Sequence, residues 1–271
     1  MSESNLATAG VPLRLDITGG KPIPFIRLVR LELRKMVDTR AGLWLLISTG
    51  LVTAAVLAIF LAVVVTQDAG TSMQELMTAI NIPMGIFLPV LGIMAVTAEF
   101  SQRTALVSFT LVPSRLRLIF AKLCAALVMA VAAVVVGYLL AVGANLLYGV
   151  ISGEDPVWNV GWGEWTGFLL LHLIGMATGF ALGALVLNTA VAIVVYFVYV
   201  FVLPPIFGVA RLFLDWFDKI APWFDFSTNQ NVLMDWDLSS KDWAHLAVSS
   251  IWWLWLPLLV GLWRVVRTEI K

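Results

Sequence analysis

The chain of 271 residues is 61% hydrophobic and only 13% charged, its mean hydropathy is +0.94, and its formal net charge is zero. Soluble domains contain about 45–50% apolar and about 25% charged residues. The composition therefore excludes a water-soluble globular protein and predicts an all-α integral membrane protein, because lipid accepts apolar surface that water does not. We expect membrane lipids around the chain and no nucleic-acid partner. The single cysteine, Cys124, excludes a disulfide within one chain.

The first 40 residues divide into a tail and an amphipathic helix. Residues 1–21 have little periodicity and predict a mobile cytoplasmic tail. Residues 22–40 are too charged to cross a membrane, but at about 100° per residue their apolar side chains share an arc. That arc holds Phe25, Ile26, Val29, Leu33, Met36 and Val37. The charged face holds Arg27, Arg30, Glu32, Arg34, Lys35 and Asp38, with Leu28 and Leu31 among the charges. We expect this helix to lie in the membrane interface, and a simple anchor is the plainer alternative.

Residues 41–271 are expected to form one six-helix transmembrane domain. Runs of about 20 apolar residues predict spans near 41–65, 77–98, 123–149, 166–187, 189–210 and 247–263. The fourth and fifth runs are separated only by Asn188 and Thr189. Together they are too long to cross a bilayer once, so they must form a tight helical hairpin. No stretch resembles a signal peptide, so we expect no segment to be removed.

The loop between the second and third predicted spans, residues 99–122, gathers several cations. Glu99 closes the second span at the negative end of the helix dipole, so we expect it to have a cationic partner. Arg103, four residues on, is the nearest candidate. Leu106 and Phe109 lie in a short apolar piece that follows, and their spacing of three places them on one helical face.

Pro113 ends this apolar piece, and Ser114 is positioned to cap the helix that becomes the third span. Arg115 and Arg117 then occupy the first turn of that helix, where the dipole disfavours cations. Groups outside the helix should therefore favour these arginines. Lipid phosphates, under the positive-inside rule alone, are the simplest such groups.

Two features mark the interior of the fourth span. Gly175, Gly179 and Gly183 recur every four residues and predict a smooth face for close helix packing, within the chain or toward a dimer or pore. His172 is the only ionisable side chain well inside any span, which makes it a candidate for the translocation path. The plainer reading is a neutral histidine bonded to a neighbouring helix. The sequence contains no cluster of metal-ligand residues, because its two histidines stand far apart.

The distribution of charge predicts the orientation. The two tails and the 99–122 loop carry fourteen basic and six acidic residues, whereas the opposite loops carry three basic and eleven acidic residues. One side thus has a net charge of +8 and the other −8. By the positive-inside rule we expect both termini to be cytoplasmic and the chain to be a multi-pass protein of the plasma (inner) membrane.

These features together resemble the permease subunits of the ABC-2 type, also termed type V ATP-binding-cassette exporters. The resemblance covers about residues 22–266 and depends on "RLELRKMVDTRAGLWLL", on "AEFSQRTALVSFTLVPSRLRLIFAK", and on six spans with both termini inside. It implies that residues 22–40 are a connecting helix, with Glu32, Arg34 and Lys35 on it. The segment 204–246, with its Pro204-Pro205 break and "IFGVARLFLDWFDKI", looks like the family's short extracellular re-entrant helices.

The resemblance further implies that Arg103 to Pro113 form a coupling helix that docks on a separate cytosolic ATPase. The implied coupling residues are Glu99, Arg103, Leu106, Phe109, Pro113, Arg115 and Arg117. The sequence has no G-x-x-x-x-G-K-[ST] phosphate loop, so ATP and Mg are expected on the partner subunit. This chain is then expected to hold no catalytic residue and no cofactor and to be no enzyme itself. A second copy, or a related permease, would complete the translocation path.

A second hypothesis is an ATP-independent secondary carrier or a membrane scaffold. Secondary carriers are expected to have internal repeats, discontinuous spans and paired charges within the membrane. The sequence shows no repeat and almost no charge inside its spans, which favours the exporter. The transported substrate does not follow from the sequence.

Overall fold

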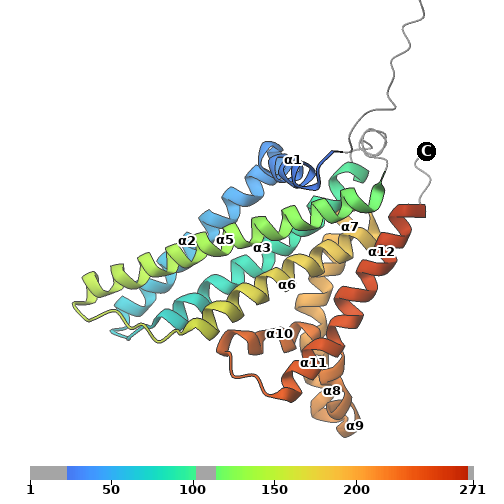
Figure 1. Cartoon of the computed structure of the whole chain (residues 1–271). Coiled ribbons are helices and arrows are strands. Elements are labelled where there is room, and N and C mark those ends of the chain that lie inside the picture. The colour runs from blue at the N-terminus through green and yellow to red at the C-terminus, as the bar shows by residue number, and fades with distance from the viewer. Residues whose placement is uncertain (1–22, 102–113, 268–271) are drawn as a thin grey trace, which may run out of the picture.

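The computed structural model describes residues 23–101 and 114–267, which are helical and contain no strand. Six helices in this part of the chain are long and apolar enough to cross a membrane, as the composition predicts. The first four are α2 (Arg40–Thr66), α3 (Met73–Ser101), α5 (Arg115–Ser152) and α6 (Trp162–Val186). The fifth and sixth cover Thr189–Phe213 and Ser240–Arg267. Figure 1 shows these helices running along one another as a bundle.

The third span begins earlier than its apolar run predicts. α5 starts at Arg115 and has 38 residues, which gives it a length of about 57 Å at 1.5 Å per residue. That is far more than the roughly 30 Å hydrocarbon core of a bilayer, so α5 extends beyond the core or tilts within it. Ser114 stands at the N-cap position, but its side chain makes no capping bond, so that detail of the prediction is wrong.

The tight hairpin between the fourth and fifth spans is confirmed. Leu187 ends α6 in the left-handed conformation with φ of 57°. Asn188 then caps the next helix, because its Oδ1 accepts the Val191 N–H at 3.1 Å. Two residues therefore reverse the chain.

The fifth span consists of α7 (Thr189–Phe197), the π-helical segment η1 (Val198–Val202) and α8 (Leu203–Phe213). The predicted break at Pro204-Pro205 is wrong, because the helix continues through both prolines. They occupy the first turn of α8, where a missing backbone N–H is tolerated. The chain turns instead at Leu214, which has an extended conformation.

Short helices precede the sixth span, within the segment 204–246 where the sequence analysis expects them. They are α9 (Asp215–Ile220), the 3₁₀ turn η2 (Ala221–Trp223) and α10 (Phe226–Asp235). The sixth span follows as α11 (Ser240–Ser250), the π-helical segment η3 (Ile251–Trp255) and α12 (Leu256–Arg267). The two π-helical segments meet, since the rings of Tyr199 and Trp253 lie 4.7 Å apart.

The predicted helix at the start of the chain is present as α1 (Phe25–Asp38), which lies across one end of the bundle (Figure 1). Its protein-facing side differs from the predicted apolar arc. The buried residues are Leu28, Val29, Glu32 and Met36. Phe25, Ile26 and Val37 of the expected arc are exposed instead. The reason is a buried charge on α1, Glu32, which requires partners on the neighbouring helices.

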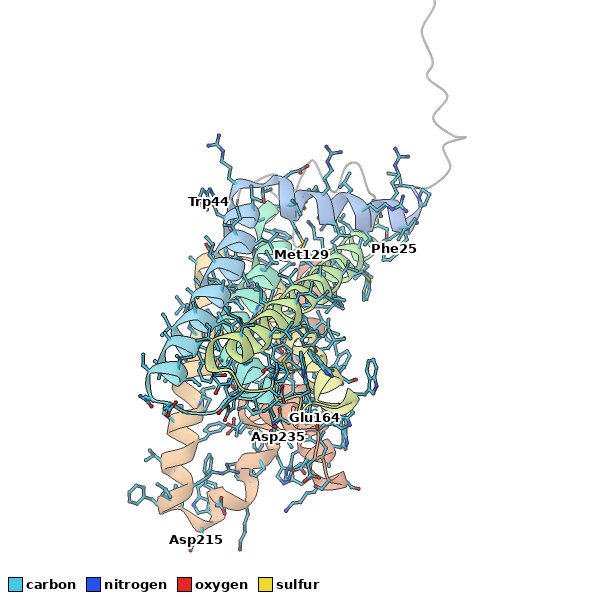
Figure 2. The ribbon with its side chains drawn as sticks, turned by 90° about the vertical axis from the view of Figure 1, so that its left-hand side faces the viewer. Phe25, Trp44, Met129, Glu164, Asp215 and Asp235 are labelled. Carbon is cyan, nitrogen blue, oxygen red and sulfur yellow. The ribbon has the colours of Figure 1, made fainter. Side chains whose placement is uncertain are left out.

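The basic side and the acidic side that the sequence predicts correspond to opposite ends of the bundle. α1, the last turn of α3, the first turn of α5 and the last turn of α12 share one end, whereas α8 to α11 lie at the other (Figure 1). Figure 2 likewise shows Phe25 and Trp44 at one end and Asp215 at the opposite end. Among the described residues the α1 end has ten basic and three acidic residues, and the α10 end has three basic and eleven acidic residues.

Candidate functional site

Four charged side chains form a closed set of ion pairs at the α1 end, here termed the charge ring. Its members are Glu32 and Lys35 of α1, Glu99 of α3 and Lys122 of α5. Lys122 Nζ lies 2.7 Å from Glu32 Oε2 and 3.0 Å from Glu99 Oε1. Lys35 Nζ lies 2.8 Å from Glu32 Oε1 and 2.8 Å from Glu99 Oε1. Each ammonium contacts both carboxylates, so the ring joins three helices and has no net charge.

The charge ring is buried on one side and open on the other. The side chains of Glu32 and Lys122 are each 4% exposed, that of Glu99 is 12% exposed and that of Lys35 is 42% exposed. Burial lowers the pKa of the Lys35 ammonium, but hydrogen bonds and charge attraction from Glu32 and Glu99 outweigh it and raise that pKa above 10.5. Glu32 and Glu99 therefore hold the Lys35 ammonium in its charged form.

The charge ring supplies the cationic partner that the sequence predicts for Glu99. The candidate Arg103 lies outside the described residues, and the partners that the structure describes are Lys35 and Lys122. They stand 64 and 23 positions away in the sequence. Local spacing could not have identified them, because both contacts depend on how α1 and α5 pack against α3.

Arg34, the third residue assigned to the connecting helix, does not belong to the charge ring. Its Nε lies 2.9 Å from Asp38 Oδ2, and both side chains are exposed. The structure thus brings Glu32 and Lys35 together with Glu99 and leaves Arg34 on the outer face of α1.

The two arginines in the first turn of α5 have partners outside that helix, as predicted. Arg115 Nη1 donates to the carbonyl oxygens of Val265, at 3.2 Å, and Val266, at 3.1 Å, in the last turn of α12. Arg117 Nη2 donates to the Ile23 carbonyl at 2.6 Å. The carbonyl end of a helix is its negative end, so the α12 contact offsets the unfavourable dipole of α5. These arginines therefore join the start of α5 to the end of α12 and to Ile23 at the α1 end.

The last turn of α3 is also bonded to α7. Thr97 Oγ1 lies 2.8 Å from Thr189 Oγ1, and Ser101 Oγ lies 2.9 Å from the same atom. The end of α3 is therefore bonded to α1 and α5 through the charge ring and to α7 through three hydroxyl groups. The segment that follows, with Arg103, Leu106, Phe109 and Pro113, lies outside the described residues, and its docking role stays a prediction.

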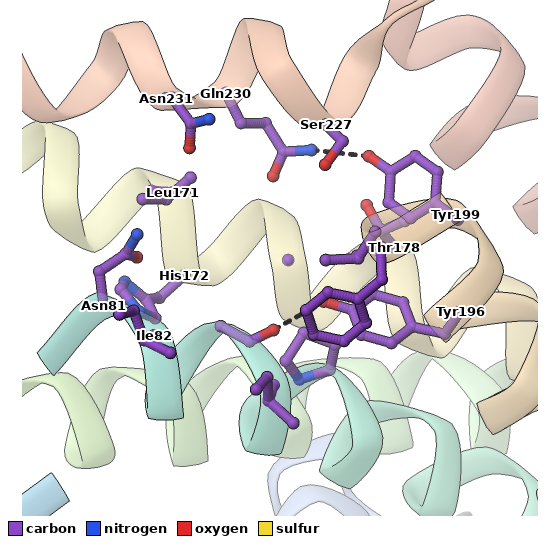
Figure 3. A pocket seen from close by; sticks show the side chains of 16 residues that line it. Asn81, Ile82, Leu171, His172, Thr178, Tyr196, Tyr199, Ser227, Gln230 and Asn231 are labelled. Atoms are coloured by element: carbon purple, nitrogen blue, oxygen red, sulfur yellow. Dashed lines mark hydrogen bonds between the residues drawn. The ribbon is translucent and has the colours of Figure 1, made fainter. Parts of the chain in front are cut away.

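A pocket of about 220 Å³, lined by both apolar and polar side chains, lies toward the α10 end of the bundle. α3, α6 and the fifth span form its walls, and α10 contributes Gln230 and Asn231 (Figure 3). Two walls are fixed by tyrosines of the fifth span. Tyr196 Oη donates to the Gly85 carbonyl at 2.7 Å, and Tyr199 Oη accepts from Gln230 Nε2 at 3.0 Å.

His172 lines this pocket and is 2% exposed. Its Nδ1 lies 2.8 Å from the Phe168 carbonyl oxygen of its own helix. The expected bond to a neighbouring helix is thus not what the described structure shows. Its Nε2 is buried and has no hydrogen-bond partner in the described part of the chain.

The three predicted glycines of α6 separate into two roles. Gly175 lines the pocket, and a Cβ there would meet only Pro89 Cγ at 3.5 Å, an ordinary contact. At Gly179 a Cβ would strike the Pro89 backbone of α3, and at Gly183 it would lie 2.7 Å from Val96. Gly179 and Gly183 therefore serve close packing within the chain, and of the four residues predicted for the translocation path Gly175 and His172 line the pocket.

No group of three or more His, Cys, Asp or Glu side chains in residues 23–101 and 114–267 could hold a metal ion. The two candidate sites lie apart in the bundle. The charge ring is at the α1 end, and the uncharged pocket is toward the α10 end. No protein-family model matches the chain, and no curated protein matches its sequence.

Proposed function

We propose that the chain is the permease subunit of an ABC-2-type exporter, which forms the translocation path and takes its energy from a separate cytosolic ATPase. The observation that carries this proposal is the charge ring. It binds α1 to the last turn of α3 and to the start of α5, directly where residues 102–113 begin. Those residues are the segment expected to dock on the ATPase.

The charge ring suits the transmission of force. Separating its members would leave a buried charge unpaired, which costs about 3–5 kcal/mol. α1, the end of α3 and the start of α5 should therefore move together when the docking segment is pushed. The hydroxyl contacts of Thr189 with Thr97 and Ser101 extend the same movement to α7.

The proposed path connects this end to the pocket. α3 and the fifth span both contact the charged end and both line the pocket around His172. A shift of either helix would change the pocket's shape, which is what alternating access requires. We further propose that both termini are cytoplasmic in the plasma membrane, and that a second copy or a related permease completes the path.

The direct test is purification of the tagged chain from its native membrane in a mild detergent. We expect mass spectrometry to identify an ATP-binding-cassette ATPase in the same complex and the complex to hydrolyse ATP in lipid. A chain that purifies without such an ATPase under all membrane-like conditions, with no ATP hydrolysis, would refute the proposal.

A double substitution tests the docking role of residues 102–113 separately. Replacing Leu106 and Phe109 by Ala should weaken ATPase capture and uncouple hydrolysis from transport, because each apolar anchor of an interface contributes about 1–4 kcal/mol. Leu116 and Phe120 of α5 are a matched control, since they are the same residue types, 44% and 46% exposed, outside the segment. Wild-type capture by the first variant would show that the segment is not the docking element.

An ATP-independent carrier remains the second candidate, and His172 is the observation that favours it. An ionisable side chain in a span, with one ring nitrogen unpartnered among the described residues, could bind a coupling proton. A carrier would drive transport in vesicles from a proton gradient without any ATPase. Transport that persists in vesicles of the purified chain alone would favour the carrier over the exporter.

A further inference from the structure

The pocket presents hydrogen-bond acceptors that no donor in the described part of the chain satisfies. A backbone carbonyl can only accept, so in the neutral His172 ring Nδ1 donates to Phe168 and Nε2 carries the lone pair. This Nε2 is buried and unpartnered within the described residues. Gln230 Nε2 donates to Tyr199 Oη at 3.0 Å and to the Phe226 carbonyl at 3.2 Å, which leaves its Oε1 as a second acceptor. An occupant must therefore offer donors.

Charge is absent from the described residues that line the pocket, all of which are apolar, hydroxyl, amide or imidazole side chains. An ion held there would lose its hydration without a counter-charge, which is strongly unfavourable. Asp225 at the start of α10 is not a lining residue, and its Oδ1 already accepts the Thr228 N–H at 3.1 Å. The pocket thus favours an uncharged occupant.

The mouth of the pocket is apolar. Ile82 and Phe201 line it and are 65% and 53% exposed, so they flank an opening on the side of the bundle. Asn81 lies eight residues, or about 12 Å, along α3 from Met73. With α3 crossing the bilayer from its α10 end, we infer that the mouth faces the hydrocarbon in the half of the bilayer nearest that end.

Amide groups extend the polar surface inside the mouth. The side chains of Asn81 and Asn231 line the pocket and make no hydrogen bond in the described part of the chain. Each amide offers both donors and an acceptor. The pocket has a volume of about 220 Å³. It suits one monosaccharide-sized head group and is too small for a complete lipid.

From these features we propose that the pocket binds the uncharged, hydroxyl-bearing head group of an amphipathic molecule, of the alkyl glycoside or glycolipid class. Two hydroxyl groups donate to His172 Nε2 and Gln230 Oε1, and the alkyl chain leaves between Ile82 and Phe201. As a statement about cargo, this inference rests on the proposed exporter function. As a statement about binding, it concerns the purified chain alone.

The experiment uses the full chain in lipid nanodiscs and an alkyl glucoside with a photoactivatable group on the chain beside the sugar. We expect irradiation to label peptides that contain Ile82 or Phe201. Excess octyl glucoside should compete, whereas octyltrimethylammonium and octyl sulfate should not. Competition by methyl glucoside, which lacks the chain, would identify a soluble sugar as the source of the same head-group chemistry.

Variants of His172 test the assigned acceptor. His172→Leu should weaken labelling about five- to hundredfold, because one buried hydrogen bond is lost and a sugar hydroxyl is left unpaired. His172→Gln keeps an acceptor and should restore much of the labelling. His245→Leu removes the other histidine, which packs against Trp223 outside the pocket, and should label like the wild type. Circular dichroism and gel filtration report the folding of each variant.

Equal competition by the charged amphiphiles, labelling confined to other peptides, or wild-type labelling of a folded His172→Leu variant would each overturn the inference. These results are independent of the ATPase. A chain that captures its ATPase but binds no neutral amphiphile refutes the cargo class alone. A chain that binds the glucoside but has no ATPase refutes the exporter and leaves the binding site intact.

Discussion

Replacing Lys122 by Met should destabilise the protein more than removal of any exposed charge. Lys122 contacts Glu32 at 2.7 Å and Glu99 at 3.0 Å, and its side chain is 4% exposed. Methionine preserves the length of the apolar stem but removes the ammonium. Two carboxylates would then share Lys35 alone, and the charge ring would have a net charge of −1. Breaking a buried ion pair by removing one partner costs about 3–5 kcal/mol.

A double-mutant cycle separates lost pairing from lost packing. Glu32→Gln in the Lys122→Met background removes the surplus negative charge and leaves Lys35 paired with Glu99. The double variant should be more stable than the sum of the single effects predicts, by about 0.5–3 kcal/mol. Arg34→Gln is the control, because the exposed pair with Asp38 contributes at most about 1 kcal/mol.

The assay is reversible unfolding in mixed micelles, followed by the fluorescence of the chain's 12 tryptophans. The free energy of unfolding of each variant is compared with that of the wild type. If Lys122→Met loses no more stability than Arg34→Gln, or if the two buried substitutions are simply additive, the charge ring does not hold α1 in place and the reasoning fails.

Three further predictions follow. Gly179→Ala should lower the free energy of unfolding by about 1–3 kcal/mol through overpacking against Pro89; Gly175→Ala has space and should be tolerated, and equal effects would contradict the packing assignment. Because the pKa of Lys35 is raised above 10.5, its pairing stabilises the fold fully below pH 10.5 and is lost as pH rises through the folded-state value; thermal unfolding of wild type and Lys35→Met should therefore converge at high pH, and a constant difference would exclude this linkage. Tags at both termini should be cytoplasmic and a label at Asp155 accessible from outside, whereas a cytoplasmic Asp155 would overturn the six-span orientation.

The existence of the six spans follows from the sequence because each is a long apolar run, but their ends do not. Hydropathy places the start of the third span at residue 123, whereas α5 begins at Arg115. Polar residues can continue a helix when other elements satisfy them, as the α12 carbonyls satisfy Arg115. The same holds for the sixth span, which begins at Ser240 with a capping box rather than at its apolar core.

The candidate site could be predicted only in part. His172 and Glu99 stand out in the sequence because each is an ionisable group in or beside an apolar run. The partners of Glu99 could not be predicted, since Lys35 and Lys122 stand 64 and 23 positions away and meet it only through helix packing. The side of α1 that packs against the bundle does not follow from hydrophobic periodicity either, because periodicity alone cannot place a buried glutamate.

The two π-helical segments set the direction of the helical turns that follow them. A π-helical turn spaces its hydrogen bonds one residue wider than an α-helical turn, so it accommodates an added residue. Deleting one residue from Val198–Val202 would restore the α-helical spacing and rotate everything beyond it by about 100°. Arg211 and the apolar face of α8 would then point in another direction. Because η1 contacts η3 through Tyr199 and Trp253, such a deletion should also disturb the packing of η3 in the sixth span.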